Sequence, residues 1–245
     1  MAPIAPAAAD VAFARNGDTI RGHAAWPPAT TPVPGLVLVP DVRGLSEHYR
    51  DVARRFAAAG FFTLALDVYS REGTPALPDM DAVMRWMAAL PDARLLGDIG
   101  AAVAYVAARP ETAGRRVGVT GFCMGGQYAL MAACTIPGVA ACVSWYGMLR
   151  YAERTGNRPQ SPLDLAPRLA CPYLGLFGAE DALIPRADVE ELRAILARAG
   201  KTFEIEMYAG AGHAFFNDTR PDAYRPAVAA AAWPRATAFL HRHLG

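Results

Sequence analysis

The chain has 245 residues, of which 53% are hydrophobic and 19% charged, so it can bury a substantial core and is not intrinsically disordered. Its 24 basic and 23 acidic residues give a formal net charge of +1, without the positive field that nucleic-acid-binding and membrane-surface proteins carry. No nucleic acid or membrane is therefore expected as a partner, and a small molecule is.

The first segments predict a loose end followed by a hairpin. Residues 1–9 are rich in Ala and Pro and have no basic residue before their apolar stretch, which indicates a loose N-terminal arm rather than a signal peptide. Two strand-like runs, Val11–Arg15 and Thr19–Ala24, flank Asn16–Gly17. Because that dipeptide favours a tight turn, we expect the runs to pair as an antiparallel hairpin at one sheet edge.

Short apolar runs then alternate with helical patterns over the rest of the chain. Each run fits a strand that is buried on both faces, so the alternation predicts a mostly parallel sheet with helices on both faces. No repeat or linker divides the chain, and one domain over residues 1–245 is expected. The expected strands are Leu36–Val39, Phe61–Leu66, Val117–Thr120, Val139–Trp145, Tyr173–Phe177 and Thr202–Tyr208, and the expected helices are Tyr49–Ala59, Asp98–Ala108, Asp188–Ala199 and Ala223–Leu244, the last broken or kinked by Pro226 and Pro234.

The long uncharged run Val117–Leu149 invites a membrane interpretation. Several glycines and a proline interrupt it, so a buried strand, helix and strand explain it better, and no membrane segment is expected.

The four cysteines stand at positions 123, 134, 142 and 171. They form no C-x-x-C pair and no histidines group near them, so no metal site is expected. Scattered cysteines of this kind fit reduced thiols in a cytoplasmic protein, where most of them fill core positions.

The segment Gly121–Gly125 has the pattern Gly-x-nucleophile-x-Gly, with Cys123 where serine is more usual. It follows the apolar run Val117–Thr120 and precedes the helical run Gln127–Ala133. Glycines fit such a sharp strand-to-helix turn because side chains at the flanking positions would collide. The turn places the Cys123 sulfur over a helix N-terminus, whose free amides favour a thiolate. The plainer alternative is a tight turn with a buried cysteine.

His213 is the expected base, and Asp181 is the carboxylate expected to orient it. His213 follows the strand-like run Thr202–Tyr208 and Asp181 follows Tyr173–Phe177, so both lie in loops at strand ends, where catalytic groups are often mounted. The chain order of nucleophile, acid and histidine is that of the α/β-hydrolase fold. Glu180 is the neighbour that could be confused with Asp181.

A loop after the strand Leu36–Val39 is expected to complete an oxyanion hole. In the α/β-hydrolase fold one backbone N–H follows the nucleophile and another comes from this loop, so Met124 and Val42 are the expected donors. Each donor could contribute roughly 3 kcal/mol to the transition state.

The chain resembles the dienelactone hydrolase family of α/β-hydrolases over nearly its whole length. The segments that carry the resemblance are LVLVPDVRGL, LALDVYSRE, GFCMGGQYAL, FGAEDALIP and GAGHAFFNDTRP. The resemblance implies hydrolysis of a lactone, typically a cyclic enol ester that bears a carboxylate. It implies Cys123, Asp181 and His213 as the triad, with no metal or organic cofactor, and a small ester or lactone as the partner.

Other family positions correspond to residues of this chain, with two departures. Asp41 stands where the family has a glutamate that contacts the nucleophile's thiol, and its alternative role is that of a turn residue. Arg71 matches the first of two arginines for the substrate carboxylate, whereas Asn217 stands where the second is expected. Arg43 is either a replacement for the missing cation or a surface residue. Tyr146 matches a substrate-contact position or is an aromatic residue at the edge of the core.

Two other functions remain open at this stage. A broad small-ester carboxylesterase or thioesterase of the same fold is favoured by Asn217. A non-catalytic protein that binds a ligand in the cleft is disfavoured by the intact order of nucleophile, acid and base. The Met-rich segment Asp79–Ala89 is a candidate lid, although helical core packing is the commoner explanation of such a segment. A monomer or small homo-oligomer is expected.

Overall fold

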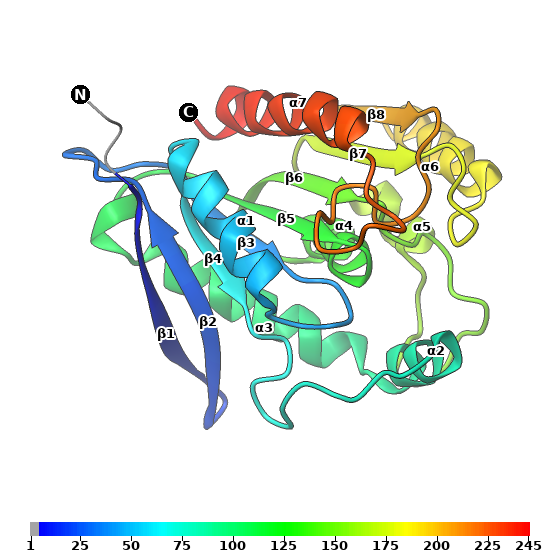
Figure 1. Ribbon diagram of the computed structural model, residues 1–245, viewed down its shortest axis with the longest axis horizontal. Helices are drawn as coiled ribbons and strands as arrows, with labels where there is room; N and C mark the ends of the chain where they lie inside the picture. The colour runs from blue at the N-terminus through cyan, green and yellow to red at the C-terminus, as the bar shows by residue number, and fades with distance from the viewer. Residues whose placement is uncertain (1–4) are drawn as a thin grey trace.

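The computed structural model describes residues 5–245 and contains an eight-stranded sheet with helices on both faces (Figure 1). The strand order is β1-β2-β4-β3-β5-β6-β7-β8. β2 is antiparallel to both of its neighbours, and every later pair is parallel, which confirms the mostly parallel α/β sheet. The strands are β1 (Ala7–Arg15), β2 (Asp18–Trp26), β3 (Gly35–Val39), β4 (Phe62–Leu66), β5 (Val117–Phe122), β6 (Val139–Trp145), β7 (Tyr173–Gly178) and β8 (Phe203–Tyr208).

The helices form two layers around the sheet. α1 and α7 cover one face, α3 and α4 pack on the other, and α2 lies apart at the lower right of Figure 1. The helices are α1 (Glu47–Ala58), α2 (Met80–Ala89), α3 (Asp92–Ala107), α4 (Met124–Thr135), α5 (Pro162–Leu165), α6 (Arg186–Arg198) and α7 (Pro226–Leu244), with short 3₁₀ turns at Pro110–Thr112 and Ala166–Arg168.

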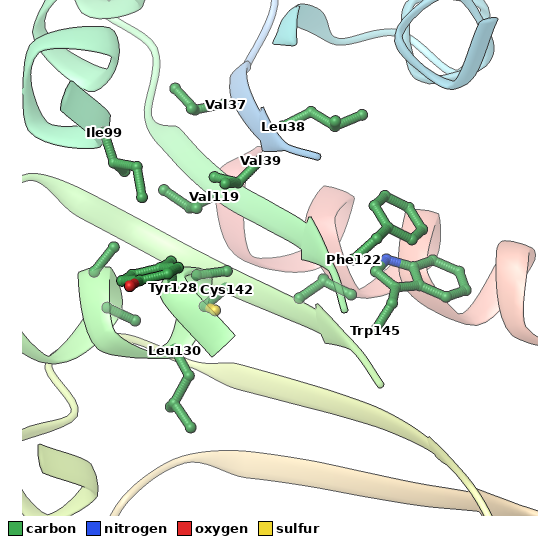
Figure 2. Close-up of a cluster of buried hydrophobic side chains, with 14 of the residues drawn as sticks. Val37, Leu38, Val39, Ile99, Val119, Phe122, Tyr128, Leu130, Cys142 and Trp145 are labelled. Atoms are coloured by element: carbon green, nitrogen blue, oxygen red, sulfur yellow. The ribbon is translucent and has the colours of Figure 1, made fainter. Parts of the chain in front are cut away.

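The central strands are buried on both faces because helices cover both sides of them. Every residue of β3, β4, β5 and β7 is buried. Figure 2 shows part of this core, in which the Phe122 and Trp145 rings stack with centroids 5.2 Å apart. The uncharged run Val117–Leu149 is strand β5, helix α4 and strand β6, as expected. Within residues 5–245, no helix is long and apolar enough to cross a membrane.

The N-terminal hairpin is confirmed, and it is longer than the sequence predicted. Asn16 and Gly17 have φ values of 50° and 88°, which a tight hairpin turn requires. Strand β1 begins at Ala7 and pairs with β2 from that residue on, so the expected loose arm is wrong for residues 7–9. Residues 1–4 of that arm lie outside the described residues.

Two expected helices differ from the prediction. α3 begins at Asp92 rather than at Asp98 and runs through Gly97, where a Cβ atom would lie 1.8 Å from the Arg15 guanidinium. The missing side chain therefore makes room for the Arg15–Asp98 ion pair. The expected break in the last helix is also wrong, because α7 runs unbroken through Pro234. Pro226 is its first residue, where a missing N–H costs no hydrogen bond.

Candidate active site

Cys123 occupies a strained position between strand β5 and helix α4. Its φ of 54° lies in the left-handed region, which a residue other than glycine rarely adopts. The flanking glycines are required by close backbone contacts. A Cβ on Gly121 would lie 2.0 Å from the Gly125 carbonyl oxygen, and a Cβ on Gly125 would lie 2.0 Å from that of Val39. The turn is therefore the sharp elbow that the sequence pattern predicts.

The contact at Gly125 also brings the loop after β3 against the first turn of α4. The Tyr69 hydroxyl donates to the Val42 carbonyl at 2.7 Å, which fixes that loop. Within the described chain, no hydrogen bond is formed by the backbone N–H of Val42 or of Met124. Two unpaired amides beside Cys123 are what an oxyanion hole requires.

His213 and Asp181 are in direct contact. His213 Nδ1 lies 2.8 Å from Asp181 Oδ2, and the other carboxylate oxygen accepts from the Leu183 N–H at 2.8 Å. The Asp181 side chain is fully buried. Glu180 instead accepts from the Gly210 N–H at 3.1 Å and supports the backbone of the histidine loop. This arrangement separates the roles of the two neighbouring carboxylates.

The loop that carries His213 is held against the end of β7. Glu180 N–H donates to the Ala211 carbonyl at 2.9 Å. Gly178, the last residue of β7, permits this contact because a Cβ there would lie 2.4 Å from the same carbonyl oxygen. The ends of β7 and β8 thus set the position of the imidazole.

The second nitrogen of His213 is free for chemistry. Within residues 5–245, Nε2 has no hydrogen-bond partner, and His213 lines one cleft together with Cys123. Burial alone would lower the pKa of His213, but the Cys123 sulfur and Asp181 raise it from 6.5 to about 10.

The cleft combines a few polar groups with an apolar wall from α2 and nearby loops. Its polar side comes from the loop after β3, the elbow and the histidine loop. The lining residues are Asp41, Val42, Arg43, Met80, Val83, Met84, Met87, Cys123, Met148, Leu183, His213, Ala214 and Arg220.

Asp41 is both a turn residue and a carboxyl group of the cleft. It is 6% exposed, and its Oδ1 accepts from the Arg43 N–H at 2.8 Å. Burial raises the pKa of Asp41, against the Arg43 amide and the Tyr49 hydroxyl, which lower it. The predicted contact between Asp41 and the Cys123 sulfur stays a prediction.

Arg71 and Asn217 are not among the residues that line the cleft, and their expected substrate contacts stay predictions. The Arg71 guanidinium binds both oxygens of Asp98, at 2.7 and 3.0 Å, and its Nε lies 2.5 Å from Asp18. All three of its nitrogens are therefore engaged. Asn217 accepts from the N–H and the hydroxyl of Thr219, so its side chain stabilises a turn.

Two other arginines line the cleft. Arg43 is exposed and forms no ion pair within residues 5–245, so it is free to meet an anion. Arg220, which the sequence analysis missed, has the exposed Asp222 as its one ion-pair partner among the described residues, at 3.1 Å. The sequence signal for Arg220 was a cation shortly after His213.

Tyr146 packs behind the imidazole rather than in the cleft. Its ring meets His213 edge-on, with centroids 5.3 Å apart, and the residue is 1% exposed. Its φ of 40° lies in the left-handed region. The contact supports the orientation of His213, whereas the expected substrate contact stays a prediction.

Helix α2 forms one wall of the cleft. The alternative of helical core packing holds for one face of the segment, because Met87 is buried and Val83 and Trp86 pack against the core. Asp79 caps the helix by accepting from the Ala82 N–H at 2.7 Å. Whether the helix moves as a lid stays a prediction.

No group of three or more His, Cys, Asp or Glu side chains that could hold a metal ion is found in the part of the chain that the structure describes. Its four cysteines are free thiols, and all except Cys123 are buried.

Comparisons with known proteins agree on one family. The model of the "Dienelactone hydrolase family" matches residues 20–244. A Bradyrhizobium protein named "Probable 2-oxo-3-(5-oxofuran-2-ylidene)propanoate lactonase" is 36% identical over 94% of this chain and 92% of its own. An Escherichia coli K12 protein named "Putative carboxymethylenebutenolidase" is 36% identical over 94% and 85%. A crystal structure titled "Putative Dienelactone Hydrolase" from Klebsiella pneumoniae has a TM-score of 0.92 and 34% identity, over 98% of this chain and 100% of that one.

Proposed function

The chain belongs to the dienelactone hydrolase family and is a lactone or ester hydrolase, and we propose that it acts through a thioester formed on Cys123. The observation that carries the proposal is the shared cleft, in which the elbow cysteine and the Asp181-bound histidine face the same space. A hydrolase of this type needs a nucleophile, a base and an orienting carboxylate, and these three residues have those chemistries.

In the first half of the reaction, the Cys123 thiolate attacks the ester carbonyl carbon. The carbonyl electron pair moves to oxygen, where the amides of Val42 and Met124 stabilise the negative charge. When the tetrahedral intermediate collapses, the ester C–O bond breaks, and the His213 imidazolium gives its Nε2 proton to the leaving oxygen. The product of this half is a thioester on Cys123 and a neutral imidazole.

In the second half, neutral His213 takes a proton from water while the water oxygen attacks the thioester. The C–S bond then breaks, and Cys123 leaves as the thiolate beside a re-formed imidazolium. Asp181 stabilises this cation in both halves and fixes the proton on Nδ1. An enol ester releases a stable enolate, so lactones of that type and activated esters suit this mechanism better than amides.

The substrate we favour is a lactone that carries a carboxylate. The lactonase relative from Bradyrhizobium is named for a propanoate, and Arg43 and Arg220 place two guanidinium groups at the cleft of this chain. Guanidinium groups bind carboxylates with charge-assisted hydrogen bonds. The proposed mechanism uses no metal or organic cofactor. The free thiols support a reducing compartment such as the cytoplasm.

A broad small-ester carboxylesterase or thioesterase is the second candidate. The pairing of Arg71 with acidic residues favours it, as does Asn217, because asparagine cannot supply a charged contact to a carboxylate. A panel that compares a carboxylated lactone with a neutral aryl ester separates the two functions. Equal kcat/KM values for both would favour the broad esterase.

The proposal is tested with Cys123→Ala and Cys123→Ser on an activated aryl ester. We expect no turnover above background for Cys123→Ala and only slight turnover for Cys123→Ser, because serine needs stronger base assistance. Circular dichroism should show both variants folded. Unchanged turnover in Cys123→Ala would falsify the nucleophile assignment.

A further inference from the structure

The apolar wall of the cleft is exposed to an unusual degree. Met80, Met84 and Leu183 are 53%, 40% and 38% exposed, and they are the exposed large hydrophobic side chains of residues 5–245. All three line the cleft that also holds Cys123 and His213. Exposed apolar side chains that gather at one site typically mark a binding surface.

The wall comes from two separate parts of the chain. Met80 and Met84 lie on helix α2, one turn apart, and Leu183 lies in the loop between β7 and α6, two residues after Asp181. Leu183 N–H is anchored on Asp181, so this part of the wall is tied to the catalytic carboxylate. A substrate substituent that extends from Cys123 along this wall therefore contacts apolar side chains from both parts of the chain.

We propose that Met80, Met84 and Leu183 select substrates that carry a flexible apolar substituent, such as a linear alkyl chain, beside the reacting carbonyl. This inference rests on the proposed hydrolase function, because it assigns a role to the wall of the same cleft. Methionine suits the role, since its unbranched side chain adapts to ligands of different shape. Substrates that lack such a substituent leave the wall exposed to water and gain nothing from it.

The expected selectivity follows from the area that the wall can cover. Full burial of one methylene group strengthens binding about fourfold. Since the wall is open to solvent on one side, half burial gives about twofold for each methylene, or on the order of tenfold for four of them.

The test uses N-alkylmaleimides as probes, because they modify the Cys123 thiol without any hydrolysis. The labelling rate of Cys123, measured by peptide mass spectrometry and divided by the rate with glutathione, should rise on the order of tenfold from N-butyl to N-octyl. The double variant Met80→Gln and Met84→Gln, and separately Leu183→Gln, should flatten this dependence. Ala88→Gln is the matched control, because Ala88 is an exposed residue of α2 that does not line the cleft.

The wild type, the wall variants and Ala88→Gln are then assayed with p-nitrophenyl esters of increasing acyl length. A flat maleimide series in the wild type, or an equal slope in the wall variants and in Ala88→Gln, would overturn the assignment of the wall. A steep maleimide series without hydrolysis of any ester would instead refute the catalytic proposal and leave the apolar selection standing.

Discussion

The change that tests the catalytic geometry most directly is Asp181→Asn. The Asp181 carboxylate is fully buried, with one oxygen on His213 Nδ1 and the other on the Leu183 N–H. Asparagine has the same shape and can still accept from Leu183 through its carbonyl oxygen. Its amide group, however, then faces His213 with N–H donors, so Nδ1 must accept a hydrogen bond.

That reversal places the ring proton on Nε2, where the mechanism needs a free electron pair to take a proton from water. It also removes the charge that stabilises the imidazolium. We expect kcat/KM to fall about 10⁴-fold, equivalent to about 5.5 kcal/mol of transition-state stabilisation. Because the two side chains have the same size, the variant should remain folded.

The assay is steady-state hydrolysis of an activated aryl ester, with thermal unfolding recorded for each variant. Glu180→Gln is the matched control, because Glu180 is the adjacent carboxylate and its acceptor role toward Gly210 survives in glutamine. It should retain activity within about threefold of the wild type, since a solvent-exposed hydrogen bond contributes little. If Asp181→Asn kept more than a tenth of the activity, or if Glu180→Gln lost as much, the assignment of the orienting carboxylate would be wrong.

Four further outcomes are expected. In Cys123→Ala, NMR titration should show the pKa of His213 well below its value of about 10, because the sulfur is lost; an unchanged pKa would contradict the influence of the sulfur on His213. Because that pKa is raised in the folded state, the stability that it contributes is complete below pH 6.5 and is lost as the pH rises through about 10. The free energy of unfolding, measured by chemical denaturation, should therefore fall more over this window in the wild type than in Cys123→Ala. Gly125→Ala should cost about 3 kcal/mol or more in unfolding free energy, since its Cβ meets backbone, whereas Gly156→Ala, with open space around it, should be nearly neutral; similar losses would refute the steric argument. Arg220→Gln should lower kcat/KM about tenfold for a carboxylated lactone and leave a neutral aryl ester unaffected, and equal effects on both would remove its role in anion binding.

The strands, and the position of the three candidate residues after strand ends, could be predicted because both follow from local patterns. Buried parallel strands are short apolar runs, and their carboxyl ends must lie at the same edge of the sheet. Cys123, Asp181 and His213 each follow such a run, after β5, β7 and β8. Chain order then assigns the roles without any knowledge of distances. The contact between His213 and Asp181 agrees with that assignment.

The substrate side of the cleft could not be predicted in the same way, because it depends on contacts between distant segments. The sequence shows Arg71 as a cation after a strand, which suits a ligand. It does not show that Asp18 and Asp98, from a hairpin and a helix, occupy all its nitrogens. Similarly, the apolar pattern of α2 indicates a buried face, but the exposure of Met80 and Met84 depends on where the helix lies.

The ion-pair cluster around Asp98 bears on which arginines are available to a substrate carboxylate. Asp98 is almost completely buried, and Arg15 and Arg71 both pair with it. Removing either arginine would leave the buried Asp98 carboxylate with too little positive charge beside it, which destabilises the fold. Arg71 therefore stays paired with Asp98. An anionic substrate must therefore bind to cations that are not paired with a buried carboxylate. Arg43, without an ion pair in the described chain, and Arg220, with only an exposed partner, fulfil that condition, and they line the cleft from the same loops that carry Val42 and His213.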